Sequence, residues 1–121
     1  MKPIISESVY RTLRHLISNL KTPGVKQLGE ELSKAQVVKD EALQSDVVSL
    51  NSIVEFEDLA LNRPIRLQIV LPEEEDLAKR KVSVFAPISV ALIGFKQSYS
   101  FQWNMPTGIK TLKIIEVRNH S

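Results

Sequence analysis

The stretch Lys81-Val82-Ser83-Val84-Phe85-Ala86-Pro87-Ile88-Ser89-Val90-Ala91-Leu92-Ile93-Gly94 decides the fold, because its pattern changes at one proline. Residues 81–85 predict a short strand. Pro87 then fits the first turn of a helix, where its missing N–H would have no partner in any case. The apolar residues of 88–95 lie on one side of that helix, and Gly94 can end it. The sequence therefore predicts a strand that leads directly into a short helix.

Alternating apolar and polar residues on both sides of this unit predict four more strands. These segments are residues 47–56, 65–71, 99–105 and 109–117. The last one has apolar residues at both parities, so it is either buried on both faces or carries a bulge. The connections are short turns, which favour antiparallel pairing. We therefore expect a curled five-strand sheet with the short helix on its concave face.

The first forty residues predict two helices instead of strands. Apolar residues recur at helical spacing over residues 9–20 and again over residues 25–35. Ser6 or Ser8 can cap the first helix. Pro23-Gly24 ends it, because proline excludes helical dihedrals at the residue before it. Two short amphipathic arms joined by a tight turn form a helical hairpin.

The chain as a whole is thus predicted to be α+β. Residues 1–42 form a short N-terminal antiparallel helical hairpin, coiled-coil-like in kind. Residues 43–121 form an antiparallel β-sheet domain with one short helix.

Composition excludes several classes of protein. The 121 residues are 43% hydrophobic and 25% charged, which is typical of a globular domain. There is no cysteine, so disulfides and thiolate metal sites are excluded. The longest mostly apolar run, residues 88–95, is far shorter than the ~20 residues of a membrane span. We expect a cytoplasmic protein without a membrane partner.

Charge gives a weak signal. The net charge is +2, too small by itself to predict nucleic-acid binding, and we expect no sequence-specific nucleic-acid contact. Residues 1–40 hold seven basic and four acidic side chains, so the front of the chain is mildly basic.

Catalytic and metal-binding patterns are weak. His15 and His120 have no second ligand at a suitable spacing. The four glycines are dispersed, so no phosphate loop is present, and no nucleophile-elbow motif supports a Ser-His-Asp triad. The acidic run at residues 73–76 fits a solvated loop better than a cation site. We predict no catalytic residue, no metal, no cofactor and no enzyme activity.

Two features can be interpreted either as purely structural or as functional. Tyr99, Phe101 and Trp103 alternate with polar residues, which is typical of a core-facing strand and only secondarily of a base-stacking platform.

The second feature is the hairpin tip. Lys21 and Lys26 flank Thr22-Pro23-Gly24. The tip is either a solvated turn or a basic probe aimed at an acidic or nucleic-acid-filled site.

An ordered set of short segments adds a family resemblance. The segments are Asp46 to Ser52, Ser83 to Pro87, Ala91 to Gly94, Trp103, Met105 to Gly108, and the closing Ile114-Ile115-Glu116-Val117. In this order they resemble the C-terminal domain of the bacterial Gre transcript-cleavage factors, and most of all their short relatives, the regulators of nucleoside diphosphate kinase. The resemblance covers about residues 46–118, whereas the hairpin is similar to that of the short relatives only in kind and length.

The resemblance implies an FKBP-like domain behind a coiled-coil hairpin, and RNA polymerase as the partner. In that family the C-terminal domain docks at the rim of the polymerase secondary channel and the hairpin enters the channel. The family's docking loop corresponds to residues 86–89. The implied docking residues are Phe85, Ala86, Pro87, Ile88 and Ser89.

The chain departs from the family at the hairpin. Gre factors use tip carboxylates to help hold a catalytic magnesium, but residues 19–27 contain no Asp or Glu and include two lysines. Each arm spans ~20 Å at about 1.5 Å per residue, much shorter than a Gre arm. Gln97-Ser98 replaces a Gly-Asp pair, and Ser89 replaces the loop glycine. The resemblance therefore implies a non-catalytic regulator that competes with Gre-type factors at the polymerase without stimulating cleavage.

Two alternatives stay open. An FKBP-like topology is compatible with a peptidyl-prolyl isomerase, which would need an aromatic-lined pocket, yet aromatic residues are only 6% of the chain. The other is an interaction module for a different partner, such as a nucleoside diphosphate kinase, for which the sequence supports only an indirect link.

Overall fold

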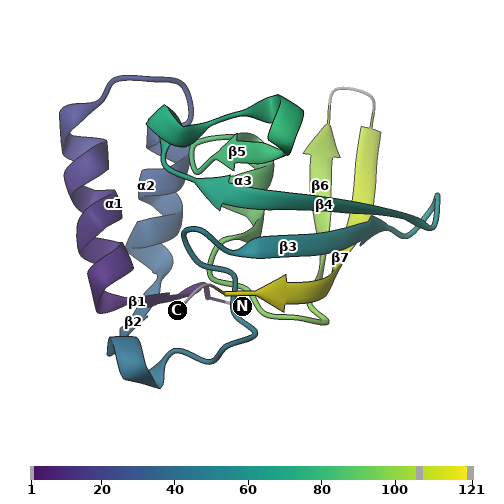
Figure 1. The fold of residues 1–121 in the computed structure, drawn as a ribbon, viewed down its shortest axis with the longest axis horizontal. Coiled ribbons are helices and arrows are strands. Elements are labelled where there is room, and N and C mark those ends of the chain that lie inside the picture. The colour runs from purple at the N-terminus through teal and green to yellow at the C-terminus, as the bar shows by residue number, and fades with distance from the viewer. Residues whose placement is uncertain (1, 106–107, 120–121) are drawn as a thin grey trace.

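The computed structural model describes residues 2–105 and 108–119, in which three helices lie beside a curled sheet (Figure 1). The helices are α1 (Glu7–Asn19), α2 (Val25–Lys34) and α3 (Pro87–Leu92). The strands are β1 (Ile4–Ser6), β2 (Gln36–Val38), β3 (Ile53–Asp58), β4 (Arg63–Val70), β5 (Lys81–Ser83), β6 (Ser100–Met105) and β7 (Gly108–Arg118). The predicted α+β class and both predicted groups of helices are confirmed.

The main sheet has five strands in the order β5-β4-β3-β7-β6. Three of its neighbouring pairs are antiparallel, as predicted, but β4 and β5 are parallel. The expectation of antiparallel pairing throughout is therefore wrong at this edge. The reason is the connection at residues 71–80, which is long enough to bring the chain back to the level of Gln68 before β5 begins.

The predicted strand over residues 47–56 begins later than expected, at Ile53. Val47 and Val48 are buried, but they pair with the segment after α3: the Val48 N–H donates to the Phe95 carbonyl at 2.8 Å. Asn51 then has a left-handed backbone (φ 72°), which a continuous strand does not allow. Burial produced the apolar pattern here without a strand.

The last strand carries the bulge that its double-sided apolar pattern indicated. In the pairing of β3 with β7, Glu55 lies opposite Glu116 and Phe56 lies opposite Ile114, so Ile115 is the extra residue. A bulge shifts the alternation by one position. This explains why apolar residues at both parities of β7 reach the interior.

A small parallel sheet at the base of the hairpin was not predicted. It consists of β1 and β2, on either side of the two helices. The Ile4 N–H donates to the Gly94 carbonyl at 2.8 Å, which joins this sheet to the end of α3. Three-residue strands are too short to show a periodic pattern, so nothing in the sequence predicted them.

The hairpin begins and turns as the sequence indicated. Ser6 caps α1, where its hydroxyl oxygen accepts a hydrogen bond from the Val9 N–H at 3.4 Å. Gly24 has a left-handed backbone (φ 92°) and immediately precedes α2. Gly24 therefore allows α2 to start. The first helix, however, ends at Asn19 with extended backbone at Leu20, before Thr22, the residue that Pro23 restricts.

One hydrophobic core joins the hairpin to the sheet. Leu13, Leu28 and Leu32 of the two helices are fully buried in the same cluster as Ile69 and Ile114 of the sheet. The core thus runs across the position between residues 42 and 43. Figure 1 shows the hairpin lying along one side of the sheet, with α3 next to it.

Candidate functional site

The predicted docking loop is a well-defined turn between β5 and α3. The Val84 N–H donates to the Val70 carbonyl at 2.8 Å, which extends the pairing of β5 with β4. The Phe85 N–H then donates to the Ser83 hydroxyl oxygen at 3.1 Å, and the Ala86 N–H donates to the Ser83 carbonyl at 3.0 Å. These bonds fix the position at which Pro87 starts the helix.

Only part of the loop faces solvent. Pro87 is exposed, and Ala86 and Ile88 are partly exposed. Phe85 is buried at 6% exposure, and Ser89 is completely buried. Residues 86–88 can therefore contact a partner directly. Phe85 and Ser89, which were also predicted to dock, are buried inside the protein.

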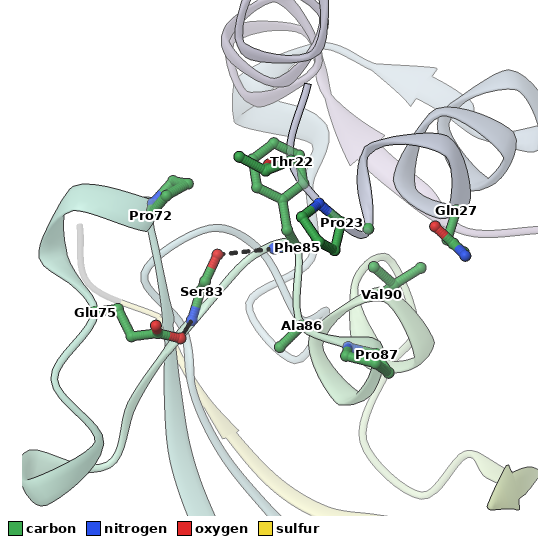
Figure 2. A pocket seen from close by; sticks show the side chains of 11 residues that line it. Thr22, Pro23, Gln27, Pro72, Glu75, Ser83, Phe85, Ala86, Pro87 and Val90 are labelled. Carbon is green, nitrogen blue, oxygen red and sulfur yellow. Dashed lines mark hydrogen bonds between the residues drawn. The ribbon is translucent and has the colours of Figure 1, made fainter. Parts of the chain in front are cut away.

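The structure brings the hairpin tip and the docking loop together. Lys21, Thr22, Pro23 and Lys26 are exposed, whereas Gly24 packs directly on the main chain of Phe85. Candidate residues from both groups line one pocket (Figure 2): Thr22, Pro23, Gly24, Phe85, Ala86 and Pro87. The other four candidates, Lys21, Lys26, Ile88 and Ser89, do not line it. The tip thus lies against the β-sheet domain at Phe85.

A pocket of about 580 Å³ lies between the tip and the loop. Its apolar lining comes mainly from Pro23, Pro72, Pro87, Phe85 and Val90, as Figure 2 shows. Such an apolar cleft, open on one side, is suited to an apolar segment of a partner.

Five lining residues of this pocket were not among the predicted site residues: Gln27, Pro72, Glu75, Ser83 and Val90. Pro72 and Glu75 are the two of them that lie outside the hairpin and the segment from β5 to α3. Both come from the connection between β4 and β5, which was interpreted only as a solvated acidic loop. Glu73 and Glu74 are indeed exposed. Glu75, however, accepts a hydrogen bond from the Ser83 N–H at 3.0 Å. No local pattern could reveal this, because the contact depends on the parallel placement of β5.

The hairpin tip is positively charged, because it carries the exposed Lys21 and Lys26. Lys21 and Lys26 form no ion pair within the described residues. Glu75 is the one carboxylate among the residues that line the pocket. The hairpin tip beside this apolar cleft therefore carries two exposed cations, neither of which lines the cleft.

The two carboxyl groups with a shifted pKa lie outside this surface. The Ser8 N–H donates to Asp40 at 3.0 Å near the start of α1 and lowers the pKa of that carboxyl. At the end of β3, the Lys110 ammonium donates to Asp58 at 3.0 Å, and this hydrogen bond lowers the pKa of Asp58. Both groups have structural partners and neither faces the pocket.

Within residues 2–105 and 108–119, no group of three or more histidine, aspartate or glutamate side chains is placed to hold a metal ion. His15 is exposed and lies 3.2 Å from Asn19, ring Nε2 to amide Nδ2. His120 lies outside the described residues. In the same part of the chain, no helix is long and apolar enough to cross a membrane.

The aromatic strand packs mostly as expected. Tyr99, Phe101 and Trp103 are half-buried and pack against the core. Phe95 stacks on Tyr99 with ring centroids 4.6 Å apart, and Tyr99 stacks on Phe101 at 5.9 Å. Their partial exposure leaves an aromatic surface along β6.

Comparison with known proteins assigns the chain to a family. The sequence model described as "Transcription elongation factor, GreA/GreB, C-term" matches residues 43–119. The chain belongs to this family. The match includes the whole loop at residues 85–89 and leaves the helical hairpin outside.

Individual relatives agree with this assignment. The regulator of nucleoside diphosphate kinase from Escherichia coli K12 is 33% identical over 91 residues, which cover 74% of this chain and 67% of that protein. The transcription elongation factor GreA from Acetivibrio thermocellus is 35% identical over 92 residues. That alignment covers 76% of this chain but 58% of the GreA chain, so this chain spans little more than half of such a relative.

Solved structures extend the similarity to the hairpin. The prokaryotic transcription elongation factor GreA/GreB from Nitrosomonas europaea superposes with a TM-score of 0.81 at 32% identity, over 98% of this chain and 99% of that one. The Gfh1 protein of Thermus thermophilus is 17% identical and superposes at 0.53 over 98% and 100% of the two chains, a likeness of fold alone. The relatives above 30% identity are named as a regulator and as transcription elongation factors.

Proposed function

We propose that this chain is a non-catalytic transcription regulator that binds RNA polymerase near its secondary channel and competes there with Gre-type factors. The observation that carries the proposal is the exposed turn at residues 86–88, which lies inside the family match and beside an apolar pocket. The same proposal places the protein in the cytoplasm with its partner.

The hairpin tip supports binding without stimulation of cleavage. Residues 19–27 contain no carboxylate, which a magnesium-assisted reaction would need from the tip. Glu75, the carboxylate in the pocket, accepts the Ser83 N–H. Because the tip also packs on Phe85, it is held at the surface that we propose for docking.

The chemistry of the surface suggests what it recognises. An apolar cleft with Lys21 and Lys26 on one side fits an apolar segment that has acidic side chains next to it. We expect the apolar contacts to supply most of the affinity, and the two lysines to contribute to the association rate.

A competition experiment tests the proposal. Fluorescently labelled chain is titrated with bacterial core RNA polymerase, and an unlabelled Gre factor is then added. We expect saturable binding that the Gre factor displaces. The Pro87→Asp variant should bind about tenfold or more weakly, because it places a charge in an apolar contact. Asp is also favourable in the first turn of a helix, so α3 should stay intact.

The matched control is Ile109→Asp. Ile109 is a similarly apolar residue, 66% exposed, but it lies in β7 and does not line the pocket. Equal loss of binding in the two variants, or no displacement by the Gre factor, would contradict the proposed site. A transcript-cleavage assay on halted complexes should show no stimulation by the wild-type chain.

The isomerase alternative has less support. Phe85 is the one aromatic residue among those that line the pocket, and it is 6% exposed. A proline-peptide isomerisation assay with clear acceleration would reverse this ranking. A direct kinase contact rests only on the name of a relative, and the same titration with a nucleoside diphosphate kinase tests it.

A further inference from the structure

The strand β6 forms an open edge of the main sheet. It is the last strand in the order and pairs with β7 on one side. The Ile114 N–H donates to the Tyr99 carbonyl, so the main chain of the odd-numbered residues points toward β7. The N–H and C=O groups of Ser100, Gln102 and Asn104 therefore point away from it. Within the described residues, none of these groups forms a backbone hydrogen bond to another segment.

This edge lacks the usual protection against pairing with another strand. Edge strands are commonly blocked by proline or by charged side chains. The six residues of β6 include neither. At the opposite side of the sheet, by contrast, the part of β4 that extends beyond β5 contains Pro64, whose nitrogen cannot donate.

A groove of about 570 Å³ runs beside the open edge. Phe101 and Gln102 of β6 line one wall, the end of α2 lines the other, and Val90 and Ala91 of α3 lie between them. Figure 1 shows α3 between the hairpin and β6. The stacked rings of Tyr99 and Phe101 give this groove an apolar surface that alternate side chains of an extended chain could contact.

The charges around the groove identify the kind of occupant. Lys2 and Lys34 line it, and the exposed Lys96 lies just beyond Phe95. Glu31 is the one acidic lining residue, and it is 3.8 Å from Lys34. The rim is therefore basic. A second copy of this chain would bring another basic front of residues 1–40 to the same place, so a foreign acidic segment fits better.

We propose that β6 binds an extended acidic peptide segment of a partner protein, which adds to the sheet as a further strand. Main-chain hydrogen bonds to Ser100, Gln102 and Asn104 would supply affinity, and the aromatic surface and the lysines would supply selectivity. The inference goes beyond polymerase docking at residues 86–88, because the two pockets share Val90 as their one common lining residue.

Amide NMR on the full ¹⁵N-labelled chain tests this proposal. The probe is a blocked heptapeptide of alternating valine and glutamate, compared with its valine–lysine counterpart. We expect the acidic probe to shift the amide signals of Ser100, Gln102 and Asn104 and to slow their hydrogen exchange. The basic probe should bind several-fold more weakly. Equal binding of the two probes, or shifts only around Pro87, would overturn the proposal.

Matched variants distinguish the contribution of main-chain hydrogen bonds at β6 from that of the lysine charges. Gln102→Pro removes an outward N–H and should abolish binding, whereas Gln102→Thr keeps the N–H and should bind like the wild type. Lys34→Glu should weaken the acidic probe about threefold to tenfold, and Lys79→Glu, remote from β6, should not. If Gln102→Pro fails to fold, the comparison of Lys34→Glu with Lys79→Glu still tests whether the acidic probe binds at this groove. Protection of the β6 amides that rises with protein concentration alone would identify a second copy as the occupant and refute the proposal.

Discussion

Gly24 at the hairpin tip lies so close to the main chain of Phe85 that a Cβ atom at residue 24 would overlap the Phe85 carbonyl oxygen. Its left-handed backbone (φ 92°) is a conformation that side chains other than glycine rarely adopt. At the other end of the hairpin, Gly94 has a similar relationship to Pro3. The hairpin is therefore fixed to the sheet domain at its tip and at its base, and both attachments depend on a missing side chain.

The first prediction concerns this tip contact. Gly24→Ala should lower the free energy of unfolding by about 3 kcal/mol, because left-handed backbone strain of ~1–2 kcal/mol adds to a clash with main-chain atoms that cannot rotate away. Urea unfolding followed by circular dichroism measures the loss. The control is Gly29→Ala, where the nearest heavy atom outside the helix is Ile17 Cδ1 at 4.0 Å. It should raise stability by up to ~1 kcal/mol through helix propensity. Equal destabilisation by both changes would contradict the close packing of the tip.

Periodicity predicted those parts of the fold in which one face of an element is buried. Leu13, Leu28 and Leu32 recur at helical spacing because both helices bury one side in the core. The same logic placed the five main strands. It failed at residues 47–52, where burial of Val47 and Val48 occurs in a loop, and it could not detect the three-residue strands β1 and β2.

The candidate site was predictable only in pieces. The loop around Pro87 followed from its sequence pattern, and the tip around Pro23 followed from proline and glycine. The tip and the loop meet where Gly24 contacts Phe85, about 60 positions later in the chain. A local sequence pattern cannot predict a contact between residues so far apart in the sequence. Glu75 entered the pocket for the same reason, since the parallel pairing of β4 with β5 brings it to Ser83.

The second prediction is a pH dependence of stability at Asp58. The hydrogen bond from Lys110 lowers the pKa of this carboxyl, against the effect of burial. A lowered pKa in the folded state stabilises the protein above the unfolded pKa of ~3.9, and this contribution is lost as the pH falls through the folded value. Asp58→Asn should therefore be less stable than the wild type at neutral pH, and the difference should shrink below about pH 4. Thermal unfolding from pH 7 to pH 2.5 measures it.

A double-mutant cycle with Lys110→Gln is the control for that effect. Lys110 donates to Asp58 Oδ2 at 3.0 Å, so most of the loss should appear once either partner is removed. The double variant should then be little worse than the single ones. Strictly additive losses would show that the two side chains stabilise the sheet independently of their contact.

The third prediction concerns Asn119, which holds the loop before β3. Its amide nitrogen donates to the carbonyls of Ser45 at 2.8 Å and Val47 at 2.9 Å, and its side-chain oxygen accepts from the Ser52 hydroxyl. Asn119→Asp keeps the acceptor and removes both donors, so it should cost about 2 kcal/mol in the free energy of unfolding. Chemical denaturation gives the value. Arg118→Gln, an exposed neighbour whose ion pair is with Glu116, should cost less than ~0.5 kcal/mol. A comparable loss at both positions would argue against this role for Asn119.

The last prediction separates charge from apolar contact in polymerase binding. Lys21 and Lys26 are exposed on the hairpin side of the pocket, and neither forms an ion pair within the described part of the chain. Replacing both with glutamate should weaken binding about tenfold in low salt and much less in 0.5 M salt, because exposed charges are screened over ~10 Å at 0.1 M and over shorter distances above it. Stopped-flow association rates at several salt concentrations measure this. Lys39→Glu at the base of the hairpin is the matched control and should change the rate little. A salt-independent loss, or an equal effect of Lys39→Glu, would mean that the tip lysines do not face the partner.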